Sequence, residues 1–418
     1  MKVAVLGAGV SGLTAARLLK DAGNQIVVYE KMDRPGGLAQ ARYVDGNIYE
    51  PYGGHIFNSK HPEVVDWVFS ILPKDKWNHV IRNAKIYYKG KFLSYPFEYA
   101  LNQLDTDDTV ECAYDFMMAQ QGPEPQTYGD WLIWNFGHGI ANRYMIPYNK
   151  KIWKYDLDDM GIGWMRGKMP LPEKKEILRS VISADSTEKN MVHSSFYYPK
   201  KGGITTFIDA LASGLDIRCS YEIRTIEKTA TGNWDINGEG EYDQIVSTIP
   251  LPELPPVMSL PENVVDHIKD LKFNSLVTGL FTGKKTDMTW LYVPSMDYPP
   301  HRINYVGNYA EDGNGEPDSV SAAIEITCHS PEDVSDEVLY SPKCVPDELG
   351  EKKVITRDFH KYAYVIHDVN YQENVDFIKD YFSTDNSFRL LGRWGTWNYN
   401  NMDLCMLDAM KLVKEITN

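Results

Sequence analysis

The stretch PYGGHIFNS, residues 51–59, places two adjacent glycines directly before a titratable ring. Gly53 and Gly54 would let the backbone come very close to a flat or bulky ligand. His55 follows at once, and a histidine side chain gains and loses a proton near neutral pH. A tight turn with an incidental histidine has the same residues. The stretch therefore predicts either a plain turn or a functional site, and other parts of the chain decide between them.

The amino terminus carries residue types and a spacing that suit a dinucleotide. KVAVL, residues 2–6, is typical of a buried parallel strand, and the glycine-rich run 7–12 follows it. Residues 13–22 predict a helix, and the next apolar run, QIVVYE, ends at Glu30. This is the order of a Rossmann βαβ unit, in which glycines admit the pyrophosphate to a helix N-terminus and the acid holds a ribose hydroxyl. The glycines concerned are Gly7, Gly9 and Gly12.

A second glycine pair follows soon after that acid. Glu30 and Lys31 precede Gly36, Gly37 and Leu38 with the spacing E-K-x-x-x-x-G-G. This run resembles the FAD-binding signature of the glutathione-reductase-like flavoproteins, particularly their amine-oxidase and protoporphyrinogen-oxidase branch. The resemblance implies FAD as the cofactor.

Four further stretches resemble the UDP-galactopyranose mutase family within that superfamily. They occur in the family's order along nearly the whole chain, and the resemblance implies that the histidine stretch lies against the flavin. The stretches are PYGGHIF (51–57), PYNKKIW (147–153), WLYVPSMDYPPHRINYVGNY (290–309) and GRWGTWNYNNMD (392–403).

Members of that family interconvert the pyranose and furanose forms of a nucleotide sugar, UDP-galactose by default. The resemblance implies that N5 of reduced FAD attacks the anomeric carbon, displaces the nucleoside diphosphate and forms a flavin–sugar adduct. NADPH or NADH is the expected reductant, although the sequence has no separate nicotinamide motif. Gly53 and Gly54 would leave the flavin face bare, and His55 would respond to the reduced flavin.

The resemblance also implies cations and phenols that hold the departing diphosphate. Arg302 is the first phosphate ligand, and Lys168 stands where the family has a second arginine, with Arg166 as a substitute. Tyr399 and Tyr364 match two phosphate-binding tyrosines, with Tyr362 as a substitute for the latter. The remaining expected site residues are Arg393 and Met402 for the cofactor, and Tyr95, Phe97, Glu98, Tyr144, Tyr148, Asn149, Trp153 and Asn401 for the substrate.

Glu98 departs from the family pattern, which has an amide at this place. An ionised carboxylate only accepts hydrogen bonds, so it suits the adjacent N1–H and N2–H₂ of guanine better than uracil. A GDP-sugar therefore stays an alternative to a UDP-sugar, as does an exposed Glu98 outside the pocket. A FAD-dependent oxidase or desaturase of the amine-oxidase type and a flavin-binding protein without catalysis are the alternatives at the level of function.

The overall composition limits the classes of binding partner that we expect. The chain has 418 residues and a net charge of −15, and it has no basic run, which excludes nucleic acid as an expected partner. Its five cysteines are scattered without a CxxC pair, so we expect no metal site and a reducing, cytoplasmic location. No apolar run approaches the ~20 residues of a membrane helix. A homo-oligomer is compatible with the sequence.

These residues need three kinds of element to position them, and the expected fold class is α/β. We predict a discontinuous Rossmann-like FAD-binding domain from residues 1–80, 196–250 and 375–418. Helical patterns rich in tryptophan predict an inserted helical domain over 100–195. Strand-like runs predict an antiparallel sheet domain for the substrate from 81–99 and 251–374. The last helix is expected from about Met402, with its N-terminus at the flavin.

Overall fold

A computed structural model of the protein describes residues 1–165, 171–183, 194–350 and 353–417. The predicted nucleotide-binding unit is present as β1 (Lys2–Leu6), α1 (Val10–Asp21) and β2 (Gln25–Tyr29). These strands lie in a parallel five-stranded sheet in the order β20-β13-β1-β2-β9. The other three strands are β9 (Ile217–Arg218), β13 (Gln244–Ser247) and β20 (Phe388–Leu390).

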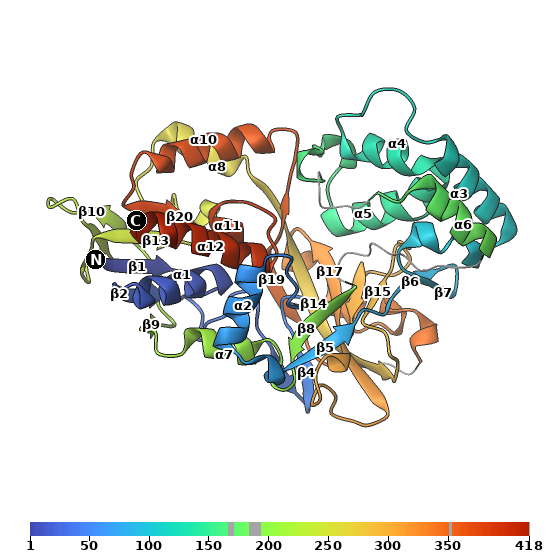
Figure 1. Ribbon diagram of the computed structural model, residues 1–418, viewed down its shortest axis with the longest axis horizontal. Helices are drawn as coiled ribbons and strands as arrows, with labels where there is room; N and C mark the ends of the chain where they lie inside the picture. Colours follow the sequence, from blue (N-terminus) through green and yellow to red (C-terminus); the bar gives the residue numbers. More distant parts are fainter. Residues whose placement is uncertain (166–170, 184–193, 351–352, 418) are drawn as a thin grey trace.

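Alternate residues of β1 enter two different cores, which explains its continuous apolar run. Val3 and Val5 belong to one buried cluster and Ala4 and Leu6 to another, because successive side chains of a strand point to opposite faces. On one face α1 packs against α12 (Met402–Thr417) and α7 (Thr205–Ala212). On the other side α10 (Tyr371–Ser383) packs against α8 (Glu262–Lys269), as Figure 1 shows.

A second, larger sheet has the order β18-β14-β17-β16-β15-β6-β7, with β19 also paired to β14. Its pairs are antiparallel, as predicted, except that β6 and β15 run parallel. The predicted hairpin around Lys89-Gly90 is confirmed as β6 and β7. The strand bounds are β6 Ala84–Tyr88, β7 Lys91–Ser94, β14 Lys272–Lys284, β15 Trp290–Tyr292, β16 Arg302–Asn304, β17 Ser319–Cys328, β18 Lys353–Val354 and β19 Asp358–Ile366.

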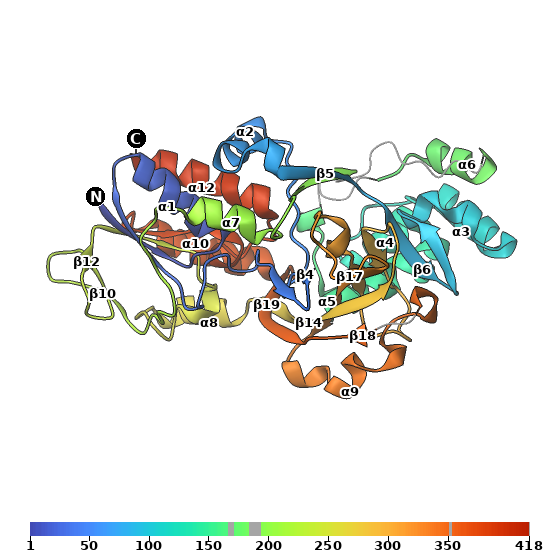
Figure 2. The same ribbon diagram turned by 90° about the horizontal axis from the view of Figure 1, so that it is seen from below.

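The helical part lies at one end of the elongated molecule, beyond the large sheet (Figures 1 and 2). Asp105 caps its first helix by accepting a hydrogen bond from the backbone N–H of Asp108. A π-helical turn at Ala141–Met145 leads into the helix that carries PYNKKIW. The helices are α3 (Thr106–Met118), α4 (Tyr128–Ile140), α5 (Ile146–Trp153) and α6 (Lys174–Ser183).

Shorter elements connect these parts. A two-stranded ribbon of β5 and β8 runs between the nucleotide-binding sheet and the large sheet (Figure 2). In the described part of the chain, no helix has both the length and the apolar character needed to cross a membrane. The remaining bounds are β3 Arg42–Val44, β4 Asn47–Tyr49, α2 Pro62–Ile71, β5 Trp77–Ile81, β8 Ser195–Pro199, β10 Ile226–Lys228, β11 Trp234–Ile236, β12 Glu241–Tyr242, α9 Asp336–Leu339 and α11 Gly392–Gly395.

The predicted division into three domains stays a prediction. The strands of the parallel sheet come from residues 2–29, 217–247 and 388–390, which all fall in the ranges proposed for the cofactor domain.

Candidate active site

A cavity of about 630 Å³ lies where the two sheets meet. Its first wall is built at the carboxyl ends of four parallel strands, where Gly7, Glu30, Thr248 and Gly392 follow β1, β2, β13 and β20. In open α/β sheets this edge is where ligands bind. Its other walls come from the histidine stretch and from the large sheet, including Arg302 and Tyr364.

The glycine-rich segments form a cradle at this edge. Gly9 and Gly36 are bridged, and the Gly36 N–H donates to Ala8 O at 2.8 Å. Gly12 lies behind the cradle, where an added Cβ would be 2.0 Å from Gly7 O, so it packs the helix against the turn. The Glu30 carboxylate lines the cavity and accepts hydrogen bonds from the Ala8 and Met32 N–H groups at 2.8 and 2.9 Å.

This cradle fits FAD. The cavity is lined by the start of α1 and by Asn401, Met402 and Asp403 at the start of α12, so two helix N-termini lie on one ligand space. Helix N-termini favour diphosphate and electron-rich ring atoms. Residues that could hold the cofactor are Gly7, Gly9, Glu30, Lys31, Gly36, Gly37 and Leu38 on one side, and Gly53, Gly54, His55, Arg393 and Met402 on the other. The described residues contain no cluster suited to a metal ion.

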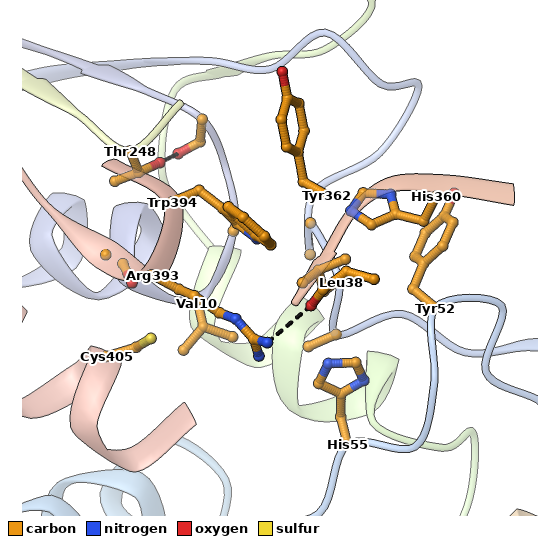
Figure 3. A pocket seen from close by; sticks show the side chains of 18 of the residues that line it. Val10, Leu38, Tyr52, His55, Thr248, His360, Tyr362, Arg393, Trp394 and Cys405 are labelled. Carbon is orange, nitrogen blue, oxygen red and sulfur yellow. Dashed lines mark hydrogen bonds between the residues drawn. The ribbon is translucent and has the colours of Figure 1, made fainter. Parts of the chain in front are cut away.

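His55 is held by its own loop and by a buried acid. Its Nδ1 lies 2.7 Å from Gly53 O, and because a carbonyl oxygen only accepts, Nδ1 carries the proton of this hydrogen bond. The His55 backbone N–H donates to Glu50, which is fully buried and also accepts from the Tyr198 hydroxyl. Burial raises the pKa of Glu50, although the His55 and Tyr198 contacts oppose this rise. The side chain of His55 faces the same space as Arg393 (Figure 3).

The two glycines of this loop line the cavity, but packing beneath the loop also demands them. Gly53 has φ +89°, and a Cβ on Gly54 would lie 1.4 Å from Asn304 Nδ2. Asn304 is fully buried and accepts a hydrogen bond from the Tyr309 hydroxyl at 2.7 Å. An open cofactor face is therefore not the only reason for these glycines, because Gly53 has a left-handed backbone and Gly54 packs against Asn304 of the large sheet.

Arg302 reaches the cavity from β16 and is paired with a buried acid on the neighbouring strand. Arg302 and Glu325 are direct cross-strand partners, and both Nε and Nη2 donate to Glu325 Oε2, at 3.1 and 2.6 Å. Burial and the Arg302 charge hold the pKa of His301 well below its usual range. His301 is therefore neutral beside the pair, and Arg302 is the cation that balances Glu325.

Two of the predicted tyrosines lie together beside Arg393, and the charge of Arg302 acts on the hydroxyl of one of them, Tyr364. The rings of Tyr364 and Tyr399 are 6.1 Å apart, and the Arg393 guanidinium lies 4.3 Å from the Tyr399 ring centre. Arg393 also donates to Ala363 O at 2.8 Å. Tyr362 lines another part of the cavity and donates to Glu253. The structure therefore groups Tyr364, and not Tyr362, with Arg302 and Tyr399.

Most of the expected aromatic substrate ligands lie behind the cavity wall. Tyr144 is stacked between Phe97 and Tyr148, at ring separations of 5.1 and 5.6 Å. Trp153 packs edge-on against both Tyr364 and Tyr399. The predicted substrate-binding residues that do not line the cavity, among the described residues, are Tyr95, Phe97, Glu98, Tyr144, Tyr148, Asn149 and Trp153. Glu98 is 7 % exposed, so it is not on the surface either.

Lys168 and Arg166, predicted to bind phosphate, lie outside the described residues. Four cavity or loop residues were not predicted from the sequence, namely Glu50, Arg82, Glu325 and His360. A single acid within the apolar run SAAIEIT was a signal for Glu325, because an acid in a buried strand requires a partner. The sequence carries no comparable signal for His360, whose pKa falls to about 4 mainly because it is buried.

The chain belongs to the family of flavin containing amine oxidoreductases, which it matches over residues 10–291. Among curated relatives, a 15-cis-phytoene desaturase from Synechococcus elongatus is 44 % identical over 66 residues, which are 16 % of this chain and 14 % of that protein. A UDP-galactopyranose mutase from Mycoplasma pneumoniae is 29 % identical over 77 residues, which are 18 % of this chain and 19 % of that protein. These matches therefore span less than a fifth of either relative.

Solved structures resemble the chain over its whole length. A crystal structure of reduced UDP-galactopyranose mutase has a TM-score of 0.88 at 21 % identity and covers 99 % of this chain and 95 % of that one. A redesigned putrescine oxidase has a TM-score of 0.65 at 13 % identity, covering 99 % and 98 %. At these identities the likeness establishes the fold. The predicted α/β flavoprotein fold and the predicted resemblance to the mutases are thus confirmed.

Proposed function

We propose that the protein is a FAD-dependent mutase that interconverts the pyranose and furanose forms of a nucleotide sugar. The observation that carries the proposal is the group of Arg302, Tyr364, Tyr399 and Arg393, which line the same cavity as His55. A row of cations and phenols suits a diphosphate, whereas an amine or a polyene needs an apolar tunnel.

Reduced FAD, when bound, supplies a nucleophilic nitrogen for the anomeric carbon of the sugar. Arg302 and the hydroxyls of Tyr364 and Tyr399 bind the diphosphate and keep it near the sugar after the bond to it breaks. The protonated Nδ1 of His55 donates to its own loop, so its Nε2 is the atom left to accept a proton on the cavity side.

UDP-galactose is the first substrate to test, and GDP-sugars are the second. The preference for guanine was based on Glu98, and this side chain does not line the cavity among the described residues. A screen should therefore incubate the dithionite-reduced protein with a panel of UDP- and GDP-sugars and detect furanose forms by HPLC.

We expect furanose formation by the reduced protein and none by the oxidised protein. Arg302→Ala should lower kcat/KM by about 100-fold or more, since a charge-assisted contact to phosphate is lost. An oxidised protein that consumes oxygen with an amine, and a reduced protein that forms no furanose from any sugar nucleotide, would contradict the proposal.

An oxidoreductase of the amine-oxidase type is the second candidate. The family match over residues 10–291 favours it, because the family is named for flavin-containing amine oxidoreductases. Oxygen consumption by the oxidised protein in the presence of amines tests this candidate directly.

A further inference from the structure

Glu50 is a buried acid beneath the histidine loop that the proposed catalytic steps do not use. Its side chain is 0 % exposed, and it directly follows β4. In the part of the chain that the structure describes, the only basic group within 4 Å of its carboxylate is the His55 ring, whose Nδ1 lies 3.6 Å from Oε2. A buried carboxylate is costly unless an opposite charge or hydrogen-bond donors lie beside it. The surroundings of Glu50 therefore decide what this acid does.

Two hydrogen-bond donors hold the Glu50 carboxylate in place. The Tyr198 hydroxyl donates to Oε1, and the His55 backbone N–H donates to Oε2. Tyr198 lies on β8, is fully buried and packs against Tyr309, with 5.3 Å between the ring centres. These contacts offset part of the cost of burial, but neither donor carries a positive charge. The carboxylate thus keeps a fixed position beneath the loop and lacks a full counter-charge.

The His55 ring can supply that counter-charge. Its Nδ1 proton is used by Gly53 O at 2.7 Å, so Glu50 acts on the ring through its charge. The ring lines the cavity and faces the same space as Arg393, as Figure 3 shows, and Nε2 is the nitrogen left for a second proton. A proton at Nε2 would create an imidazolium next to a buried carboxylate, which is an attractive pair.

The other ionisable groups around this pair do not favour a proton on His55. Lys31 and Arg393 add positive charge to the same space, because both act together with His55 to lower the pKa of His360. Burial is the main cause of that shift, which takes the pKa of His360 to about 4 and leaves it neutral. The two tyrosines beside Glu50 also stay neutral, since burial and the Glu50 charge raise their pKa values. Among these groups, Glu50 is the one whose charge favours a protonated His55.

We propose that Glu50 is a positioning residue that makes His55 the site of proton uptake when the bound flavin is reduced. The inference rests on FAD binding, which the proposed function also requires, and on no particular sugar. Two electrons from a reductant such as dithionite reach FAD with one proton at N5, so the ring keeps one negative charge. A second proton then binds at Nε2 of His55, where the Glu50 carboxylate and the reduced ring both favour it.

The test measures the midpoint reduction potential of the FAD-loaded protein at several pH values near neutrality, without any sugar nucleotide. The slope of this potential against pH gives the number of protons taken up per two electrons. The variants are His55→Gln and Glu50→Gln, which removes the charge but keeps an oxygen for the His55 N–H. The matched control is Glu253→Gln, because Glu253 also lines the cavity but accepts from Tyr362 and Lys361. The absorbance spectrum of the reduced flavin shows whether its ring is anionic.

We expect the wild type and Glu253→Gln to take up two protons per two electrons, and Glu50→Gln and His55→Gln to take up one. The reduced ring should be anionic in all four proteins. Wild-type proton uptake by Glu50→Gln or by His55→Gln overturns the inference. A neutral reduced ring in the wild type also overturns it, because the second proton would then be on the cofactor.

If Glu50→Gln does not retain FAD, Glu50→Asp decides. Its shorter side chain draws the carboxylate away from Nδ1 of His55, so the second proton should be lost at a lower pH than in the wild type. An unchanged profile in this variant overturns the inference.

The readout separates a charge effect from a merely structural one. A loosened loop changes the FAD affinity or the potential at every pH, whereas the loss of a proton site changes the slope. The measurement includes no substrate, so a protein without mutase activity can still show this role of Glu50, and an active mutase can still lack it. A wild-type protein that binds no FAD would contradict the proposed function together with the inference.

Discussion

Single residues decide how closely the histidine loop can approach the large sheet. Gly54 leaves room for the Asn304 amide, and Asn304 is in turn held by Tyr309. Glu50 binds the same loop from the other side, through the His55 N–H. The position of the His55 ring therefore depends on buried contacts that do not themselves touch a ligand.

Gly54→Ala should lower the free energy of unfolding by about 2 kcal/mol. The added methyl would overlap the side chain of Asn304, which is fully buried and has no free space to move into. The substitution should also lower FAD content, since the loop would move into the cavity. Chemical denaturation and flavin absorbance measure the two effects. Gly163→Ala is the control, as an added Cβ at Gly163 would meet nothing within 4 Å in the part of the chain that the structure describes.

A double-mutant cycle that combines Gly54→Ala with Asn304→Ala identifies the cause of this loss of stability. If the clash is with the amide, the two substitutions together cost less than the sum of the single costs. Additive costs would contradict the packing explanation.

At the scale of elements, one buried lysine joins α5, which packs behind the cavity wall, to the segment that follows β15. Lys151 on α5 is 3 % exposed and donates from Nζ to Val293 O and Ser295 O, both at 2.7 Å. Burial lowers the pKa of Lys151 to about 7. A neutral amine has two N–H donors, and these two carbonyl groups accept both of them. Lys151 thus fixes the helix of Tyr148 and Trp153 to the loop between β15 and β16.

Lys151→Met should reduce the free energy of unfolding by about 2 kcal/mol at high pH, since two buried carbonyl groups lose their donors. The pH dependence has a definite sign. Between about pH 7 and 10.5 the unfolded chain holds a proton on Lys151 that the native protein lacks, so wild-type stability gains from Lys151 as pH rises across this range. The variant should lack this gain.

Urea unfolding of the wild type and of Lys151→Met at several pH values measures this pH dependence of stability. Lys150→Met, on the same helix but exposed, should follow the wild type. A Lys151→Met protein with the wild-type dependence on pH would show that the lysine is charged in the native state.

The whole molecule closes around the cavity from segments that are far apart in sequence. The cavity walls include Gly7, His55, Arg82, Arg302 and Met402, so one ligand contacts both sheets and the last helix. A ligand that binds only the native arrangement stabilises it by an amount that depends on the ligand concentration relative to its Kd.

FAD removal should therefore lower the thermal unfolding midpoint, and FAD at 100 times its Kd should restore about 2.7 kcal/mol. FMN should restore less at the same concentration, because it lacks the adenosine half that the glycine cradle and Glu30 would hold. Differential scanning calorimetry with FAD, FMN and ADP measures this. Equal stabilisation by FMN and FAD would contradict the assignment of the glycine cradle to the adenosine half.

The nucleotide-binding unit and the class of fold follow from local features of the sequence. Residues 2–30 form strand, glycine turn, helix and strand as predicted, because their propensities, apolar periodicity and glycines are local and all agree. The start of the last helix at Met402 and the hairpin around Lys89-Gly90 were predictable for the same reason.

The set of side chains that share the cavity, in contrast, depends on contacts between distant parts of the chain. Tyr362 and Tyr364 are two residues apart on one strand, yet Tyr362 donates to Glu253 while Tyr364 lies beside Tyr399. Arg82 and Arg302 are 220 positions apart in the sequence and meet around Tyr292, because β15 pairs with both β6 and β16. Such neighbours depend on strand order and register. These are set by long-range packing and are not encoded in a local sequence pattern.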